Sequence, residues 1–183
     1  MYFACSSLND EAPMSHPPLP AALIREATTA DAPAFVAIYN HFVQHTIVTF
    51  EEVLVTAEEF ARRMDMVRTA SLPCLCAEVD GVIAGYAYAS PWKERSGYRF
   101  SLESTVYLAP DRPGRGIGTA LYHALFARIR DWGAHAVMGG ISLPNEASVA
   151  LHEKLGMRKV AHFEAVGFKF GRWVDVGYWQ RVL

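Results

Sequence analysis

The sequence contains few cysteines, no long apolar run and no excess of one charge. Its 183 residues include 17 Lys and Arg against 19 Asp and Glu, which gives a net charge of −2. Such a balance provides no broad basic surface for nucleic acid or for an anionic membrane. A membrane-spanning helix needs roughly 20 consecutive apolar residues, and the apolar runs here are much shorter. We therefore expect no nucleic-acid partner and no membrane span.

Cysteine and histidine are also too sparse for several kinds of site. The three cysteines are an odd number, and Cys74-x-Cys76 lies in an apolar, strand-like run. Reduced, buried thiols in a cytoplasmic protein are the simplest account of this pattern. His41 and His45 are four residues apart but lack a third ligand, so we expect no metal site.

The first residues differ in composition from the rest of the chain. Residues 1–22 mix Pro, Ser and polar residues without periodicity, and they lack the basic segment and continuous apolar stretch of a signal peptide. We expect a flexible leader here. About half of the whole sequence is apolar, so residues 23–183 can form one globular domain with its own core.

The order of the expected elements indicates an α+β or mixed α/β domain. After a first strand at 23–27 come two helices, separated by a β-branched, extended segment at 46–50, and the second helix opens at the capping box Thr56–Glu59. Two strands joined by the hairpin turn Asp80-Gly81 follow. The remainder is predicted as a strand at 100–108, a helix, a strand at 136–141, a short helix from Asn145, and two final strands at about 157–170 and 174–182.

The stretch from Ser101 to Tyr122 carries the strongest signal. In the strand, Glu103 shares a polar face with Thr105 and Tyr107, while the other face is apolar. A glycine-rich loop from Gly114 to Gly118 then leads into an amphipathic helix. A strand, a glycine-rich loop and a helix in this order present free backbone N–H groups to an anion, most often a phosphate.

The glycine loop alone does not identify the ligand. A P-loop would end in Gly-Lys-Ser/Thr, whereas this loop continues Gly116-Ile117-Gly118-Thr119 without a lysine. The glycine spacing also differs from the dinucleotide-binding fingerprint. A loop that merely closes the helix onto the sheet therefore stays open as an alternative to a phosphate site.

The residues around the loop resemble a known family. Pro113 to Gly118 is similar to the acetyl-CoA-binding motif of the GCN5-related N-acetyltransferases, Gln/Arg-x-x-Gly-x-Gly/Ala, with Pro113 in the place of the usual first residue. The resemblance implies the fold of that family, a mixed, mostly antiparallel sheet flanked by helices, with acetyl-CoA as co-substrate. The cofactor-binding residues it implies are Val106, Tyr107, Leu108, Pro113, Gly114, Arg115, Gly116, Ile117, Gly118, Thr119 and Asn145.

Longer stretches narrow the resemblance to phosphinothricin and methionine sulfoximine/sulfone N-acetyltransferases. They are Tyr39-Asn40-His41, Thr49-Phe50, Pro91 to Arg95, Glu103 to Tyr107, Leu143-Pro144-Asn145, His152-Glu153 and Gly167 to Gly177. This resemblance implies that Glu103 is the general base and His152 an assisting group. It also implies an amino-acid-like substrate and a substrate site formed by Phe50, Lys93, Arg95, Tyr98, Thr105, Tyr107 and Trp173.

Purely structural interpretations of these residues stay open. Glu103 could be a solvated carboxylate at a strand edge, Lys93 and Arg95 could lie on a solvated turn, and Trp173 could belong to the core. The same fold could also acetylate a protein N-terminus, another amino acid or an antibiotic, or could bind acyl-CoA without catalysis. Relatives of this fold often form dimers, so a homodimer is expected by resemblance.

Overall fold

A computed structural model describes residues 22–111 and 116–183 of the chain. The expected leader, apart from Ala22, lies outside the described residues, and so do Pro113, Gly114 and Arg115. Seven strands form one sheet in the order β1-β2-β3-β4-β5-β7-β6. The strands are β1 (Leu23–Glu26), β2 (Cys74–Val79), β3 (Val82–Pro91), β4 (Ser101–Leu108), β5 (Ala136–Leu143), β6 (Arg158–Lys169) and β7 (Arg172–Val182). All neighbouring pairs are antiparallel except β4 and β5.

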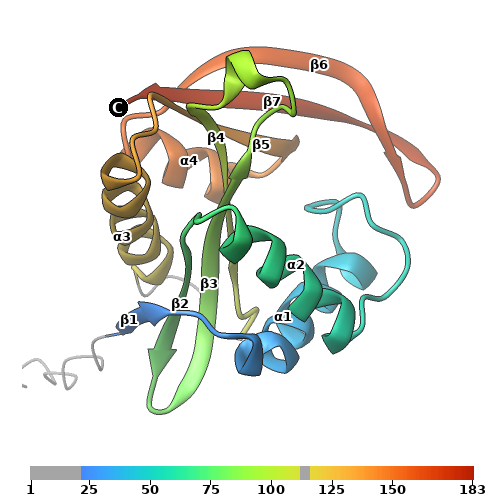
Figure 1. Cartoon of the computed structure of the whole chain (residues 1–183). Helices are drawn as coiled ribbons and strands as arrows, with labels where there is room; N and C mark the ends of the chain where they lie inside the picture. Colours follow the sequence, from blue (N-terminus) through green and yellow to red (C-terminus); the bar gives the residue numbers. More distant parts are fainter. Residues whose placement is uncertain (1–21, 112–115) are drawn as a thin grey trace, which may run out of the picture.

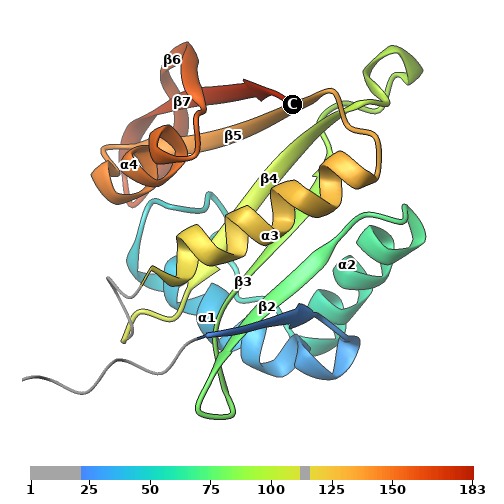
Figure 2. The ribbon, with the colours of Figure 1, turned by 90° about the vertical axis from the view of Figure 1, so that its left-hand side faces the viewer.

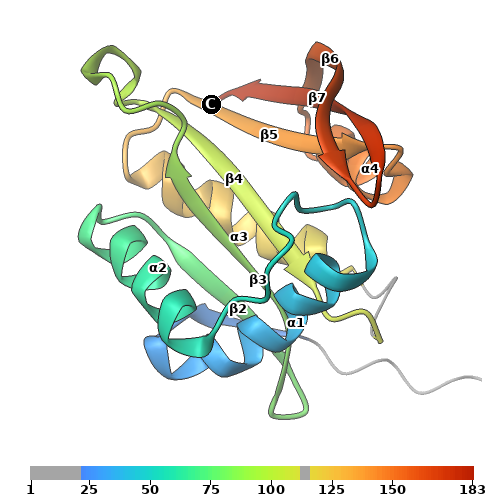
Figure 3. The ribbon, with the colours of Figure 1, turned by 90° about the vertical axis from the view of Figure 1, so that its right-hand side faces the viewer.

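Helices cover both faces of the sheet. Helices α1 (Ala32–His45) and α2 (Ala57–Thr69) lie on one face, and α3 (Ile117–Asp131) and α4 (Glu146–Lys154) lie on the other (Figures 1, 2 and 3). Short 3₁₀ turns occupy Thr29–Asp31 and Ser96–Tyr98. The predicted sheet with flanking helices is thus confirmed. None of the helices in the described parts of the chain has the length and apolar character that crossing a bilayer requires.

Two cores form because alternate residues of each strand face opposite helices. Below α3, small residues of β2 and β3 such as Ala77, Ala87 and Ala89 let the buried side chains of the helix approach closely. On the other face Phe35 of α1 stacks on Tyr86 of β3, with ring centroids 4.1 Å apart. Strand β3 lies between the two cores and is therefore packed on both faces.

The expected extended segment at 46–50 joins no strand. Thr46 instead closes α1, because its backbone N–H and its hydroxyl both donate to the carbonyl of Phe42. The same hydroxyl then accepts from the backbone N–H of Val48, at 3.2 Å. These local bonds favour a turn over a strand. We call residues 46–56 the α1–α2 loop.

Strands β4 and β5 are paired over only three residue pairs. Ser101, Leu102 and Glu103 lie opposite Ala136, Val137 and Met138, and beyond Glu103 the pairing ends. From there β4 keeps only β3 as a neighbour, and β5 keeps only β7. The central sheet therefore opens immediately after Glu103.

Candidate active site

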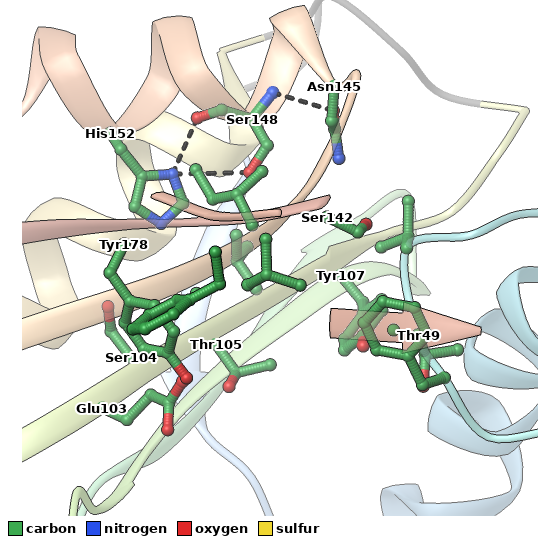
Figure 4. Close-up of a pocket in the computed structure, with 18 of the residues that line it drawn as sticks. Thr49, Glu103, Ser104, Thr105, Tyr107, Ser142, Asn145, Ser148, His152 and Tyr178 are labelled. Carbon is green, nitrogen blue, oxygen red and sulfur yellow. Dashed lines mark hydrogen bonds between the residues drawn. The ribbon is translucent and has the colours of Figure 1, made fainter. Parts of the chain in front are cut away.

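A cavity of about 760 Å³ lies where β4 and β5 separate. Its lining comes from the α1–α2 loop, the two separating strands, α3, α4 and the β6–β7 hairpin (Figure 4). Seven of the predicted site residues line it, namely Phe50, Glu103, Thr105, Val106, Tyr107, Asn145 and His152. The fold thus gathers residues from six separate segments at one opening in the sheet.

The backbone of β4 offers hydrogen-bonding groups to this opening. The carbonyl of Phe100 accepts from β5-side N–H groups, whereas Ser101 and Ala109 bond towards β3. Because the direction of the backbone groups alternates along a strand, the N–H groups of Val106 and Leu108 point towards β5. No β5 residue pairs with them, since the β4–β5 ladder ends at Glu103.

Two adjacent glycines in β5 leave space on opposite faces of the strand. A Cβ on Gly139 would lie 2.5 Å from the His152 ring, while a Cβ on Gly140 would lie 3.2 Å from Oε1 of Glu103. Successive residues of a strand point to opposite faces. Glu103 and His152 therefore approach β5 from opposite faces, and both need the space that a side chain would fill.

Glu103 is the acidic residue of this cavity. Burial raises the pKa of its carboxyl above the usual value, and the nearby Lys93 partly opposes this shift. Tyr178 of β7 also lies close, since a Cβ on Gly140 would lie within 3.4 Å of both Glu103 and the Tyr178 ring. A carboxylate of raised pKa beside an open space is suited to accept a proton from a bound group.

His152 is almost completely buried, with 3% of its surface exposed. Its Nδ1 lies 2.7 Å from the carbonyl oxygen of Ser148, one helical turn earlier in α4. A carbonyl can only accept, so Nδ1 carries the proton. Burial also lowers the pKa of His152, which favours the neutral ring with a lone pair on Nε2.

The hydroxyl of Tyr122 lies 3.2 Å from Nε2 of His152. It is the donor to Nε2, because the neutral ring carries its only proton on Nδ1. Burial raises the pKa of Tyr122 well above its usual range, so the phenol stays protonated at neutral pH. Tyr122 and His152 thus form one buried pair that joins α3 to α4 beside the opening.

Two helices begin near the cavity, α3 after Gly116 and α4 after Asn145. Gly116 precedes α3 with a φ of +71°, a conformation that glycine adopts without strain. Ile117 and Gly118 are buried and Thr119 is half-buried, so Ile117 can offer a ligand only its backbone. Asn145 caps α4, where its side-chain oxygen accepts from the N–H of Ser148 at 3.1 Å.

Other predicted substrate residues lie outside the main cavity. Lys93 and Tyr98 line a neighbouring cavity of about 460 Å³, which shares Phe163 and Tyr178 with the main one. Arg95 lines a separate cavity beside Trp92. Trp173 is 66% exposed and packs on Phe168, with ring centroids 5.0 Å apart. Leu108 packs against the core below α3. Their roles stay predictions.

A bulge in β6 brings further residues to the cavity. Pairing with β7 is interrupted between Phe163 and Gly167, and Val166 from this bulge lines the cavity. Asp175 of β7 fixes the bulge by accepting from the N–H of Ala165 at 2.8 Å and from Nε2 of His162 at 2.7 Å.

Sequence reasoning missed several lining residues, namely Thr49, Ser104, Tyr122, Gly140, Ser142, Ser148, Phe163 and Tyr178. Two signals were available. Gly139-Gly140 inside a strand indicates a close approach of other groups, and Ser148 stands one helical turn before His152. In the described residues no group of three His, Cys, Asp or Glu side chains could hold a metal ion.

Comparison with known proteins gives this arrangement a family. Residues 21–157 match the model of the "Acetyltransferase (GNAT) family". The chain is 41% identical to phosphinothricin N-acetyltransferase of Streptomyces viridochromogenes, over 86% of each protein. It is 36% identical to the L-methionine sulfoximine/L-methionine sulfone acetyltransferase of Salmonella typhimurium, over 86% of this chain and 92% of that protein.

A solved structure agrees with these relatives. The phosphinothricin acetyltransferase of Sinorhizobium meliloti in complex with acetyl-CoA superposes with a TM-score of 0.86 at 35% identity, and the match covers 89% of each chain. The chain therefore belongs to the acetyltransferase (GNAT) family. The predicted family and its N-acetyltransferase class are confirmed.

The hydrogen bond between Tyr122 and His152 leads to a prediction about acetyl transfer. Tyr122→Phe and His152→Phe both remove this bond while keeping an aromatic ring, so each should lower kcat about tenfold, or about 1.4 kcal/mol. Tyr122→Phe also removes a 3.5 Å bond to the Ser104 carbonyl, and His152→Phe also removes the bond to the Ser148 carbonyl. The loss in the double variant should be smaller than the product of the two single losses, because both changes delete the shared bond. Steady-state kinetics at temperatures below each variant's melting point would check this, and losses that multiply would contradict it.

Proposed function

We propose that the chain transfers an acetyl group from acetyl-CoA to the α-amine of a small amino-acid-like substrate. Phosphinothricin, methionine sulfoximine and methionine sulfone are the proposed substrate class. The observation that carries the proposal is the half-buried Glu103 of raised pKa, situated where β4 and β5 separate. The names of the relatives support the class of amine. Transfer would be direct, with both substrates bound together.

The opening between β4 and β5 fits acetyl-CoA. The extended pantetheine arm of acetyl-CoA carries amide groups. The N–H groups of Val106 and Leu108 point into the opening without a β5 partner. The N–H of Leu108 and the side chain of Asn145 would hold this arm, which leaves the N–H of Val106 for the acetyl group. The start of α3 at Gly116 to Thr119 would offer backbone N–H groups to the phosphates. When bound, acetyl-CoA supplies a thioester that an uncharged amine can attack.

Glu103 would prepare the amine for that attack. An α-ammonium group has a pKa near 8 and must lose a proton before its nitrogen becomes nucleophilic. The Glu103 carboxylate would accept this proton, directly or through one water molecule. The N–H of Val106 would donate a hydrogen bond to the carbonyl oxygen under attack, where negative charge develops.

His152 and Tyr122 would act on the other side of the opening. Glu103 and His152 approach β5 from opposite faces, so the amine and the thioester can meet between them. His152 would assist as a hydrogen-bond acceptor that orients the Tyr122 hydroxyl. His152 would therefore not act as a general acid through Nε2, because the neutral ring has no proton on that nitrogen to donate.

Lys93 is the proposed partner of the substrate carboxylate. It is close enough to Glu103 to lower the pKa of that carboxyl, and its cavity adjoins the main one at Phe163 and Tyr178. Phe50, Thr105 and Tyr107 would shape the pocket around the amine. Tyr98 would join Lys93 from the same neighbouring cavity. Arg95 and Trp173 line neither of these two cavities, so a role for them would require the 92–100 segment and the start of β7 to move towards the amine.

Glu103→Gln tests the role of the base. Because burial raises the pKa of Glu103, the active carboxylate is lost as pH falls through that raised pKa, so kcat/KM of the wild type should rise with pH in this range. The variant should lose this limb and be slower by about 10² or more at pH 7, with a smaller deficit at high pH where more amine is already neutral. An unchanged pH–rate profile would remove Glu103 from this role.

A panel of amines tests the substrate class. Thiol release from acetyl-CoA should be rapid with phosphinothricin, methionine sulfone and methionine sulfoximine, and slow with an N-terminal peptide or an aminoglycoside. A higher rate with the aminoglycoside than with the three amino-acid-like amines would favour an antibiotic as substrate. No release with any amine, together with a rise in Tm on adding acetyl-CoA, would instead favour a non-catalytic acyl-CoA-binding protein.

We also propose that the chain works as a homodimer. Apolar side chains stand exposed along the edge hairpin of the sheet, namely Val160, Phe163, Val166, Phe168, Phe170 and Trp173. Such a strip on an edge hairpin is typical of a protein–protein interface. Light scattering should give twice the 20.3 kDa of one chain, and Phe170→Glu should shift the mass towards the monomer. A wild-type monomer at micromolar concentration would contradict the proposal.

A further inference from the structure

One side of the cavity is built from two segments that are far apart in the sequence. Val48, Thr49 and Phe50 come from the α1–α2 loop, and Gly167 and Phe168 come from the end of β6. The α1–α2 loop contains no strand in this part, so no ladder of backbone hydrogen bonds holds it against β6. Its position must depend on side chains.

Lys169 provides the main contact between these segments. Its side chain is 1% exposed, yet its ammonium group reaches the carbonyl of Thr49 at 2.7 Å and that of Phe42 at 3.5 Å. Burial lowers the pKa of Lys169, and Glu51 and Glu52 oppose this shift. Burying an ammonium group costs free energy that an apolar side chain would not cost. The lysine is therefore better explained by the carbonyls it holds than by the space it fills.

Gly167 makes the second contact, two residues earlier on the same face of β6. A Cβ at this position would collide with the ring of Phe50, so the ring lies directly over the glycine backbone. Lys169 thus holds Thr49, and Gly167 receives the next residue, Phe50. Both partners line the cavity, whereas the Lys169 side chain does not.

We infer that Lys169 is a positioning residue that sets the amine-binding side of the cavity through Thr49 and Phe50. It acts without touching either substrate. The inference rests on the proposed function, because the amine must occupy this side of the cavity. Asn145 and His152 stand on the opposite side of the cavity, whereas the hydrogen bonds of Lys169 go to Thr49 and Phe42.

Lys169→Met tests this assignment, with Lys159→Met as the matched control. Lys159 lies on the same strand but is exposed. Its ammonium group stands over the Trp179 ring, 5.5 Å from the centroid, and lies 3.2 Å from Nδ1 of His162, which is itself exposed. Lys169→Met should raise KM for methionine sulfone about tenfold, since the pocket wall is displaced, and should leave KM for acetyl-CoA unchanged. Lys159→Met should change neither. An unchanged amine KM in Lys169→Met, or an equal rise in both KM values, would overturn the inference.

Amide hydrogen exchange gives a readout that does not depend on turnover. Exchange in residues 46–56 should accelerate in Lys169→Met and not in Lys159→Met, because the loop loses its anchor. Equal exchange in the two variants would overturn the inference even if the wild type acetylated none of the amines. If the wild type acetylated none of the amines in the panel, that result would by contrast count against the proposed function alone.

Gly167→Ala provides a second variant should Lys169→Met fail to fold. The added methyl group would push Phe50 from the other side, so the same selective rise in amine KM is expected. If both single variants fold, their effects should combine less than multiplicatively, because they displace the same loop. A Gly167→Ala enzyme with wild-type amine KM would show that the Phe50 position does not matter for the amine.

Discussion

The two parts of the sheet, β1–β4 and β5–β7, are joined by only three residue pairs between β4 and β5. Each of these strands has a second neighbour that continues to satisfy its backbone, so they can diverge after Glu103 without unfolding. The divergence leaves backbone donors such as the Val106 N–H facing an opening instead of a strand. Buried backbone groups need partners, and a bound molecule with amide groups can supply them. The cavity, its ligand and the position of Glu103 all depend on this early end of one ladder.

Around the opening, small residues decide which side chains can approach. Gly139 leaves room for His152 on one face of β5, and Gly140 leaves room for Glu103 and Tyr178 on the other. A side chain at Gly139 would overlap the His152 ring, and one at Gly140 would press against Glu103 and Tyr178. The proposed chemistry can therefore use both faces of a single strand, with Glu103 accepting the amine proton on one face and the Tyr122–His152 pair held on the other.

The rest of the site is built by contacts between distant segments. Tyr122 and His152 bring α3 and α4 together, Asp175 fixes the bulge that presents Val166, and Lys169 holds the α1–α2 loop. The contacts of His152 and Lys169 bury a polar group beside the cavity, which is costly unless the group is well partnered. Such contacts give a cavity one defined shape, and the affinity for a small amine depends on that shape.

The sequence alone determined the elements and the chemical character of the central stretch. Alternation in residues 101–108 predicted which face carries Glu103, and motif resemblance predicted the family. The glycine loop alone indicated either a phosphate site or a close helix–sheet contact. These features are local, because a strand pattern or a loop composition depends on neighbouring residues. The extended segment expected at 46–50 was the local exception, since Thr46 bonds back to Phe42.

Only the tertiary structure decided which distant residues share the cavity. It separated Arg95 and Trp173 from the main cavity, added Tyr122 and Tyr178 to it, and turned Lys169 from an unexplained residue of a motif into a buried link to Thr49. It also fixed the proton of His152 on Nδ1 through the Ser148 carbonyl. These outcomes depend on strand register, on the angle at which β4 and β5 part and on burial. Those quantities arise from packing between residues up to 120 positions apart, which no local pattern records.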